Sequence, residues 1–291
     1  MNKYIIYAEW LVDYIMQEPY VFIKTLEKYG WNSIPLGKVN YEYLNNAVVL
    51  FVTYDNVNIA KFKSNKNKII YKVDDLFPMT ETRRKCIEVA DLIIGPYQYH
   101  FEKLFTKNSL WIPYSAIPTF YSEIEFNSSP INKIFVSGAL AECYPLRNYI
   151  STNSNYEELI EKLPHPGYNA SGSTVNKIYY KNISRYICGF CDASSYQYIM
   201  GKIFEIPSVG SLLLVEDTLK TQLNILGFVD MKTCIMCNKE NLLEKINWIL
   251  DIENRIFVDN IRKSGMELVR LKHNTFVRSE FFNFHLNKDI I

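Results

Sequence analysis

Short apolar runs alternate along the chain with longer stretches in which apolar residues recur at helical spacing. Runs such as KYIIYA and KIIYK are typical of buried strands, and the stretches between them are typical of amphipathic helices. In the first half the expected strands are Lys3–Ala8, Ser33–Leu36, Ala47–Thr53, Lys68–Lys72, Leu92–Gly95 and Leu110–Pro113. The expected helices include Tyr20–Tyr29, Glu81–Ala90 and Tyr99–Phe105. This alternation predicts βαβ units and therefore an α/β fold.

The alternation is interrupted once and then restarts. The segment from Ile117 to Asn132 is polar and rich in turn residues, and it therefore predicts a linker. We expect an N-terminal domain over residues 1–120, a linker over 121–132 and a C-terminal domain over 133–291. In the second domain the expected strands are Lys133–Gly138, Tyr186–Cys191, Ser211–Val215 and Thr233–Met236. The expected helices are Tyr156–Leu163, Lys239–Asp251 and Asn254–His273, and the segment Val175–Ile183 is expected to be a helix or a turn. Two Rossmann-like domains facing a cleft would bind ligands at the carboxyl ends of their strands.

Composition and charge narrow the function classes. Of the 291 residues, 48% are hydrophobic and 15% aromatic, which excludes disorder over most of the chain. The formal net charge of +1 argues against a nucleic-acid-binding protein, although a local basic patch is compatible with it. Glu9 and Asp13 interrupt the apolar N-terminus, and no apolar run approaches the roughly 18–20 residues of a membrane span, so we expect a soluble, cytoplasmic protein. We attribute the 22 tyrosines to a composition bias of the genome.

Two CxxC pairs raise the question of a zinc site. They are Cys188 with Cys191 and Cys234 with Cys237. Four thiolates can close a tetrahedral zinc site, but the two pairs lie much further apart than the roughly 15–20 residues of a zinc ribbon. Both pairs also occur in strand-like runs, where residues i and i+3 point to opposite faces. We therefore interpret these cysteines as buried structural residues and predict no metal site.

The motifs of several common enzyme classes are absent from the sequence. There is no GxGxxG, P-loop, HExxH or GxSxG, and the four histidines show no metal-ligand spacing. What remains is the segment MGKIFEIPSVGSLLLVE, in which Lys202 and Glu205 lie three residues apart on one helix face. An ordinary surface ion pair is one interpretation. In the other, Glu205 is partly buried beside an apolar helix and binds polar groups such as vicinal ribose hydroxyls.

The C-terminal half resembles the C-terminal domain of GT-B-fold glycosyltransferases of the group 1 type. The resemblance is carried, in this order, by KIFEIPSVGSLLLVED, LGFVD, NLLEKINWIL and GMELVRLKHNTFVR. In the family this region runs from an (R/K)xFE helix to an HT(F/Y)xxR-like signature, which here spans His273 to Arg278 with one residue inserted after the histidine. The resemblance covers roughly Lys133 to Phe284, including VSGALAECYPLR and LPHPGY. The first 120 residues match only in architecture and in the IPYSAIPTFY transition.

The resemblance implies a donor site in the second domain. Glu205 would hold the ribose of a nucleotide sugar, and Lys202 would neutralise its diphosphate. Ser137 and Gly138 would let the backbone approach phosphate oxygens. Arg147 is a second candidate for the diphosphate, because a planar guanidinium suits bidentate phosphate contact, and an ordinary surface arginine is the alternative.

One departure from the family leaves the stereochemistry open. Many retaining members carry two glutamates with seven residues between them, and Gln197 stands where the first would be. A glutamine can contact a sugar hydroxyl, but it cannot act as a carboxylate. In an inverting enzyme Asp74 or Asp75, which follow the strand IIYKV, would be the general base. The alternative is that one of them caps the following turn.

The sequence as a whole predicts a metal-independent, hexosyltransferase-type glycosyltransferase without a cofactor. It would move a sugar from a nucleotide-diphosphate donor to an acceptor hydroxyl, with a carbohydrate or glycan acceptor as its other partner, no nucleic acid and no membrane span. Tyr97, His100 and Tyr114 are candidates for the acceptor side, and residues 279–291 are expected to pack back across the first domain. Two alternatives stay open: a non-catalytic nucleotide-sugar-binding module, suggested by Gln197, and a nucleotide-sugar epimerase or hydrolase on the same scaffold.

Overall fold

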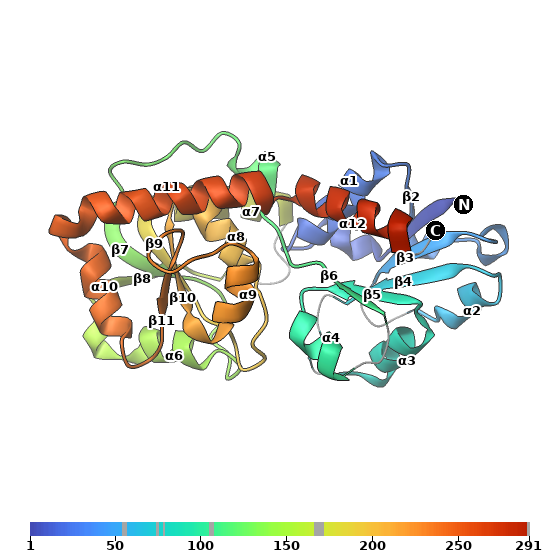
Figure 1. Ribbon diagram of the computed structural model, residues 1–291, viewed down its shortest axis with the longest axis horizontal. Coiled ribbons are helices and arrows are strands. Elements are labelled where there is room, and N and C mark those ends of the chain that lie inside the picture. The colour runs from blue at the N-terminus through green and yellow to red at the C-terminus, as the bar shows by residue number, and fades with distance from the viewer. Residues whose placement is uncertain (54–56, 74–75, 78, 105–107, 166–171, 290–291) are drawn as a thin grey trace. The chain divides into compact units, whose positions relative to one another are not determined.

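The computed structural model describes residues 1–53, 57–73, 76–77, 79–104, 108–165 and 172–289. Packing divides the chain into two units, one comprising Met1–Tyr114 with Thr275–Ile291 and the other Ser115–Asn274. We call them unit 1 and unit 2. The chain therefore leaves unit 1, builds unit 2 and returns to unit 1 with its last helix (Figure 1). The domain boundaries expected from the sequence, in contrast, place that helix in the second domain.

Unit 1 is built on a parallel sheet with the strand order β2-β1-β3-β4-β5-β6. The strands are β1 (Lys3–Tyr7), β2 (Asn32–Pro35), β3 (Val48–Val52), β4 (Lys68–Lys72), β5 (Leu92–Gly95) and β6 (Ser109–Trp111). Its helices are α1 (Glu18–Glu27), α2 (Ala60–Lys63), α3 (Glu81–Val89), α4 (Gln98–Leu104) and α12 (Thr275–Asp289). All five residues of β3 are buried, as expected for a central strand covered on both faces. The strands expected from the sequence are confirmed to within two residues at their ends.

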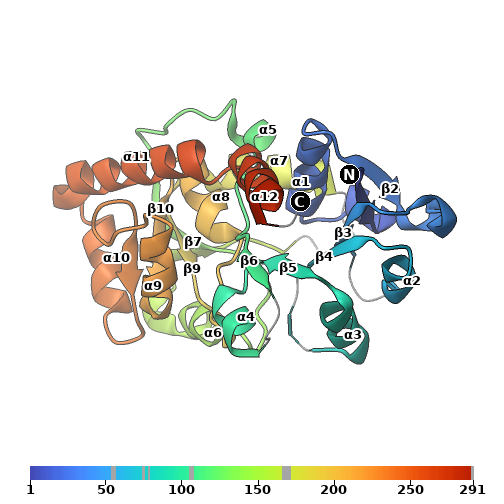
Figure 2. The ribbon, with the colours of Figure 1, turned by 45° about the vertical axis from the view of Figure 1, so that its right-hand side comes forward.

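The last helix completes the core of unit 1. Phe282 and Leu286 of α12 belong to the same core cluster as Ile5, Phe22 and Leu50. The ring of Phe282 lies 5.8 Å from that of Phe22. Figure 2 shows α12 beside α1, on the side of the sheet that this cluster occupies. The expectation that the final stretch packs on the first domain is confirmed.

Unit 2 contains a second parallel sheet, with the strand order β11-β10-β9-β7-β8. The strands are β7 (Ile131–Val136), β8 (Ile160–Lys162), β9 (Tyr186–Cys191), β10 (Leu212–Glu216) and β11 (Ile235–Cys237). The helices are α5 (Pro118–Tyr121), α6 (Pro145–Thr152), α7 (Gly172–Ile183), α8 (Lys202–Ser208), α9 (Lys220–Ile225), α10 (Leu242–Leu250) and α11 (Arg255–Lys272). Two parallel α/β sheets confirm the predicted pair of Rossmann-like domains.

One predicted element is wrong. The segment Tyr156–Leu163, expected to be a helix, instead forms a short turn and the strand β8. Its apolar residues recur at positions 156, 159, 160 and 163, which is helical spacing. In the structure Ile160 pairs with Ile134 of β7, and its side chain joins the core of unit 2. Pairing at the sheet edge therefore overrides the local helical pattern.

The cysteines of the two CxxC pairs are buried, as predicted, and all are free thiols. Cys188 and Cys237 belong to one core cluster. Burial raises the pKa of both thiols, so they stay protonated and behave as small apolar side chains. Within the described residues no group of histidine, cysteine or acidic side chains is arranged to hold a metal ion.

No helix in the described parts of the chain is long and apolar enough to cross a membrane.

Candidate functional site

The site predicted in unit 2 forms at the carboxyl end of β7. Gly138 follows this strand in the left-handed region, with φ of 102°. A Cβ atom at this position would lie 2.9 Å from Nη1 of Arg147 and would clash with Nζ of Lys202. Only glycine leaves room for two cationic groups to approach the backbone here. We refer to Ser137, Gly138, Arg147 and Lys202 as the cradle.

Lys202 reaches the cradle from the first turn of α8. Its Nζ donates a hydrogen bond of 2.6 Å to the carbonyl oxygen of Ser137. Burial, reinforced by the charge of Arg147, lowers the pKa of Lys202 to about 8. The side chains around Lys202 therefore do not fully compensate the charge of the protonated amine, and an anion bound in the cradle would do so.

Arg147 is 2% exposed, so the alternative of an ordinary surface arginine is wrong. Its Nη2 lies 2.6 Å from Oδ1 of Asp192, and its Nη1 donates to the carbonyl oxygen of Ala139 at 3.1 Å. The guanidinium also stacks 4.0 Å from the ring centroid of Tyr144. Its Nε is buried and has no hydrogen-bond partner among the described residues. A buried N–H without a partner is costly, and a phosphate oxygen would satisfy it.

Glu205 lies one helical turn after Lys202, at the same end of α8. The residue is half-buried, in agreement with the expectation from the sequence. Its charge favours the protonated form of Lys202 and raises the pKa of the buried hydroxyls of Tyr179 and Tyr180, after the larger effect of their burial. The structure therefore brings the ribose carboxylate implied by the resemblance close to the cradle.

Two residues at the site, Asp192 and Tyr179, are not predicted from the sequence. Asp192 directly follows β9 and is completely buried. Tyr179 of α7 places its hydroxyl 3.0 Å from Oγ of Ser137. The first could have been found by the rule that selects Asp74 and Asp75, namely a carboxylate at the carboxyl end of a buried strand. The second is hidden by the tyrosine excess, which we set aside as composition bias.

Gln197, the remaining donor-side candidate, makes fewer contacts with the site than the residues of the cradle do. Gln197 is exposed and adopts a left-handed φ of 50° on the turn after β9. Its carbonyl oxygen accepts a hydrogen bond of 3.3 Å from Gln222. Among the described residues, the hydrogen bonds that build the cradle do not involve Gln197. The two base candidates, Asp74 and Asp75, lie outside the described residues.

The acceptor-side candidates belong to unit 1 and contact other aromatic or cationic side chains. Tyr97 and Tyr114 are nearly fully buried. The ring of His100 lies 5.0 Å from that of Phe77, and Nζ of Lys72 lies 5.8 Å from the ring of Tyr114. Burial lowers the pKa of His100, so its imidazole is neutral at physiological pH. Their role toward an acceptor stays a prediction.

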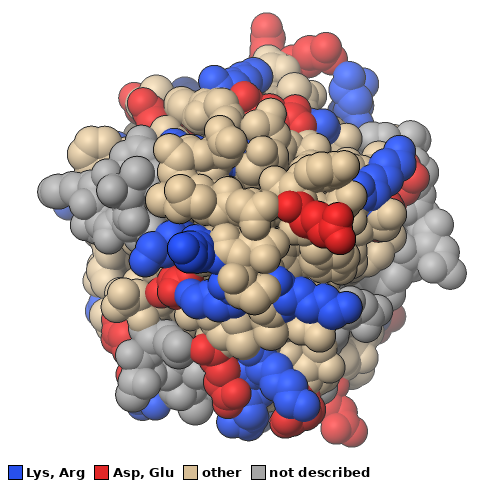
Figure 3. All heavy atoms as spheres, turned by 90° about the vertical axis from the view of Figure 1, so that its right-hand side faces the viewer, with Lys and Arg blue, Asp and Glu red and all other residues tan. Residues whose placement is uncertain are grey.

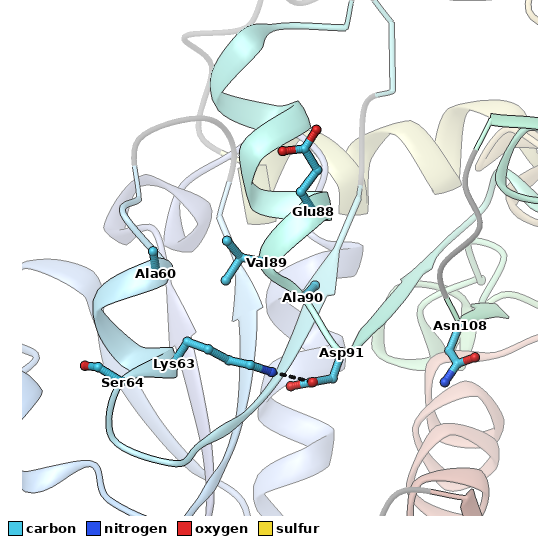
Figure 4. Close-up of a pocket in the computed structure, with 8 residues that line it drawn as sticks. All are labelled: Ala60, Lys63, Ser64, Glu88, Val89, Ala90, Asp91 and Asn108. Carbon is cyan, nitrogen blue, oxygen red and sulfur yellow. Dashed lines mark hydrogen bonds and ion pairs between the residues drawn. The ribbon is translucent and has the colours of Figure 1, made fainter.

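Unit 1 also carries a pocket of about 760 Å³. Figure 4 shows Lys63 of α2 reaching toward Asp91, with which it forms an ion pair, while Glu88 points away from this pair. Asp91 and Asn108 precede β5 and β6, so the pocket lies at the amino ends of these strands. The lining residues are Ala60, Lys63, Ser64, Glu88, Val89, Ala90, Asp91 and Asn108. None of them belongs to the cradle, and this edge is opposite the one where parallel sheets bind ligands.

Basic side chains gather on one face of unit 1 despite the near-zero net charge. Figure 3 shows Lys and Arg side chains across the middle of this face. Four exposed lysines lie within eight residues between the start of α2 and the first residue of β4, namely Lys61, Lys63, Lys66 and Lys68. The near-zero net charge of the chain therefore does not exclude a locally basic surface. The expectation that the protein binds no nucleic acid stays a prediction.

Comparison with known proteins supports the fold. No family model and no curated protein matches the sequence. Among solved structures, an alpha-glucosyltransferase in complex with UDP and DNA is 13% identical, with a TM-score of 0.66 over 97% of this chain and 98% of its own. Sucrose-phosphate synthase from Thermosynechococcus elongatus is 10% identical, with a TM-score of 0.61 over 98% of both chains. HepE from Anabaena in complex with UDP-glucose is 11% identical, with a TM-score of 0.63 over 98% of this chain and 99% of its own.

These similarities extend over nearly the whole chain. The fold is that of the GT-B glycosyltransferases, as the resemblance implies.

Proposed function

We propose that the protein is a metal-independent glycosyltransferase that moves a sugar from a nucleotide-diphosphate donor to an acceptor hydroxyl. The observation that carries this proposal is the convergence of Lys202 and Arg147 on the bare backbone of Gly138, close to Glu205. Two cations beside a glycine suit a diphosphate, and a half-buried carboxylate suits the vicinal hydroxyls of a ribose. Solved structures of similar fold contain UDP or UDP-glucose, which supports the same class of donor.

The chemistry follows from where charge develops. Cleavage of the bond between the sugar and the diphosphate leaves negative charge on the departing nucleoside diphosphate. Lys202 and Arg147 would stabilise this charge from fixed positions, without the reorganisation that water would need. Protein cations would thus take the role that a metal ion has in other sugar transferases. The acceptor would be a carbohydrate or glycan hydroxyl bound by unit 1.

Replacement of Glu205 by glutamine tests the donor site. The side chain keeps its shape but loses its charge, so it no longer makes charge-assisted hydrogen bonds to the ribose. Such bonds contribute about 1.5–3 kcal/mol, and we expect calorimetry to show an affinity for UDP roughly ten to a hundred times weaker. Glu267→Gln, which removes an exposed carboxylate of α11, is the matched control. Equal affinities in wild type and Glu205→Gln would show that the ribose assignment is wrong.

The donor itself can be identified by thermal shift. A ligand present at a hundred times its dissociation constant adds about 2.7 kcal/mol to the free energy of unfolding. We would screen UDP, GDP and ADP sugars, and then measure release of the nucleoside diphosphate with a panel of glycan acceptors. A protein that no nucleotide sugar stabilises would contradict the proposal.

Gln197 favours a second candidate, a nucleotide-sugar-binding module without turnover. The residue stands where retaining relatives carry a glutamate, and it is exposed on its turn. This candidate predicts tight donor binding with no product across the acceptor panel. Gln197→Glu separates the two functions: turnover that appears only in this variant would show that the wild-type protein binds the donor without catalysis, whereas turnover already present in the wild type would exclude the binding module.

A further inference from the structure

Asp192 contacts Arg147 through both oxygens of its carboxylate. Oδ1 lies 2.6 Å from Nη2 of the guanidinium, and Oδ2 accepts a hydrogen bond of 3.1 Å from the backbone N–H of Arg147. Both side chains are nearly inaccessible, with exposures of 0% for Asp192 and 3% for Arg147. A buried ion pair persists only where its geometry compensates for desolvation, so this arrangement is strongly defined.

The two contacts have different structural effects. Arg147 is the third residue of α6, after Pro145 and Leu146, and its backbone N–H is one of those that a helix start leaves without an intrahelical partner. One oxygen of Asp192 satisfies this N–H and fixes the first turn of the helix. The other fixes the guanidinium at the end of the side chain. Asp192 thus fixes both the backbone and the guanidinium of Arg147.

Asp192 is itself held on a rigid corner. It follows β9, whose last residue Cys191 pairs with Val215 of β10. The next backbone N–H, that of Ala193, donates a hydrogen bond of 2.9 Å to Oε2 of Glu216. The pairing of β9 with β10 therefore holds the backbone of Asp192 in place, and the carboxylate of Asp192 in turn holds Arg147 of the cradle.

We infer that Asp192 is the positioning residue of the donor diphosphate site, which it serves by orienting Arg147 and by offsetting one of the two cradle cations. The inference rests on the proposed function. Without Asp192, Lys202 and Arg147 would be two positive charges converging on one glycine with less compensation. With Asp192, the guanidinium is held by Nη1 and Nη2, and Nη1 is kept beside the backbone of Gly138.

A positioning role has a signature that a merely structural role lacks. The charged and titratable groups around Lys202 are Arg147 of α6, Cys191 and Asp192 at the end of β9, Glu205 of α8, and His165 after β8. Among them the negative charges of Glu205 and, to a smaller extent, Asp192 favour protonated Lys202. Removing the charge of Asp192 lowers the pKa of Lys202, which is about 8 in the intact protein. The loss of diphosphate affinity at alkaline pH therefore moves to lower pH, whereas loosened packing would weaken binding equally at every pH.

The experiment compares UDP binding to wild type and Asp192→Asn by calorimetry between pH 6 and 9. We expect an affinity at least tenfold weaker at pH 7 and an alkaline midpoint shifted to lower pH. Asp259→Asn is the matched control, because it removes the carboxylate from another buried arginine of unit 2, Arg262, at 2.6 Å. It should leave both quantities unchanged. An Asp192→Asn protein that binds like wild type, or whose midpoint does not move, would overturn the inference.

Two further measurements test the route by which Asp192 acts. At pH 6, where Lys202 is protonated in every variant, Arg147→Met and the double variant Arg147→Met/Asp192→Asn should bind UDP equally weakly, because Asp192 orients Arg147; an additional loss in the double variant at this pH counts against the inference. The charges of Lys202 and Arg147, after partial burial, lower the pKa of His165, so its NMR titration reports the charge of the cradle. The pKa of His165 should fall further in Asp192→Asn, because a negative charge is removed from the cradle. If wild type did not bind UDP at all, the result would contradict the proposed function rather than the role of Asp192.

Discussion

Gly138→Ala is expected to weaken the binding of UDP by at least about a hundredfold. A side chain at φ of 102° is strained, and the added Cβ would occupy the space into which Nζ of Lys202 and Nη1 of Arg147 converge. Both cations must then move away from the diphosphate. A hundredfold loss corresponds to about 2.7 kcal/mol, which is consistent with weakening two charge-assisted contacts. Calorimetric titration with UDP measures the effect directly.

Gly30→Ala provides the matched control for this substitution. Gly30 also has a left-handed φ, of 81°, but a Cβ there meets no atom within 4 Å. The control therefore carries a comparable backbone strain in unit 1 without any contact to the cradle. Both variants should lose thermal stability, and only Gly138→Ala should lose affinity. If Gly138→Ala retained wild-type affinity, the cradle would not be the diphosphate site.

The affinity for a nucleotide sugar is expected to fall with rising pH above about 8, approaching tenfold per pH unit. Burial and the charge of Arg147 lower the pKa of Lys202 to about 8 in the protein alone. A bound diphosphate stabilises the protonated amine and raises this pKa, so binding takes up a proton whenever free Lys202 is neutral. Below pH 8 the amine is already charged and the affinity is constant. Calorimetry from pH 7 to 9 in buffers of different ionisation enthalpy would detect both the slope and the proton uptake.

Two substitutions separate this titration from other alkaline effects. Lys202→Met should bind about a hundredfold more weakly at pH 7 and show no further loss up to pH 9. Lys202→Arg keeps its charge across this range, because arginine does not deprotonate in proteins, and its affinity should be independent of pH. An alkaline slope that survived in Lys202→Met would assign the titration to another group.

Lys202 also makes the free energy of unfolding depend on pH, and this dependence has the opposite sign to that of the donor affinity. The pKa of Lys202 falls from its ordinary value of 10.5 to about 8 in the folded protein, so the unfolded chain binds more protons between these two values. The contribution of Lys202 to the free energy of unfolding therefore increases as pH rises through this window. Comparing wild type with Lys202→Met isolates this contribution, since the variant lacks the titrating group. Across the lower part of the window, the protein without ligand gains stability while its affinity for the donor falls.

The sequence predicts most strands because each is a short apolar run bounded by turn residues. This pattern survives in β3 and β9, which are buried along their whole length. The pattern fails at β8, where the apolar positions of residues 156–163 fit a helix equally well. Only the partner strand β7 decides between the two, and pairing between distant segments cannot be inferred from local periodicity.

The candidate donor site, which comprises the cradle together with Glu205, Asp192 and Tyr179, is predictable from the sequence only in part. Ser137, Gly138, Lys202 and Glu205 lie in motifs that a resemblance can align, and the structure brings them together. Asp192 lies in no such motif, because its effect depends on Arg147, 45 residues earlier in the chain. The contact exists only once β9 and α6 are folded against each other. A positioning residue of this kind becomes visible from coordinates rather than from spacing.

The return of α12 to unit 1 has a consequence for the order in which the chain can fold during synthesis. Unit 2 is one continuous segment, from Ser115 to Asn274, and is complete while the ribosome is still translating the last helix. Unit 1 begins first, but it lacks Phe282 and Leu286, which belong to its core, until α12 has been translated. The half that is synthesised first is therefore completed last, and part of its apolar core stays uncovered in the nascent chain until α12 is added.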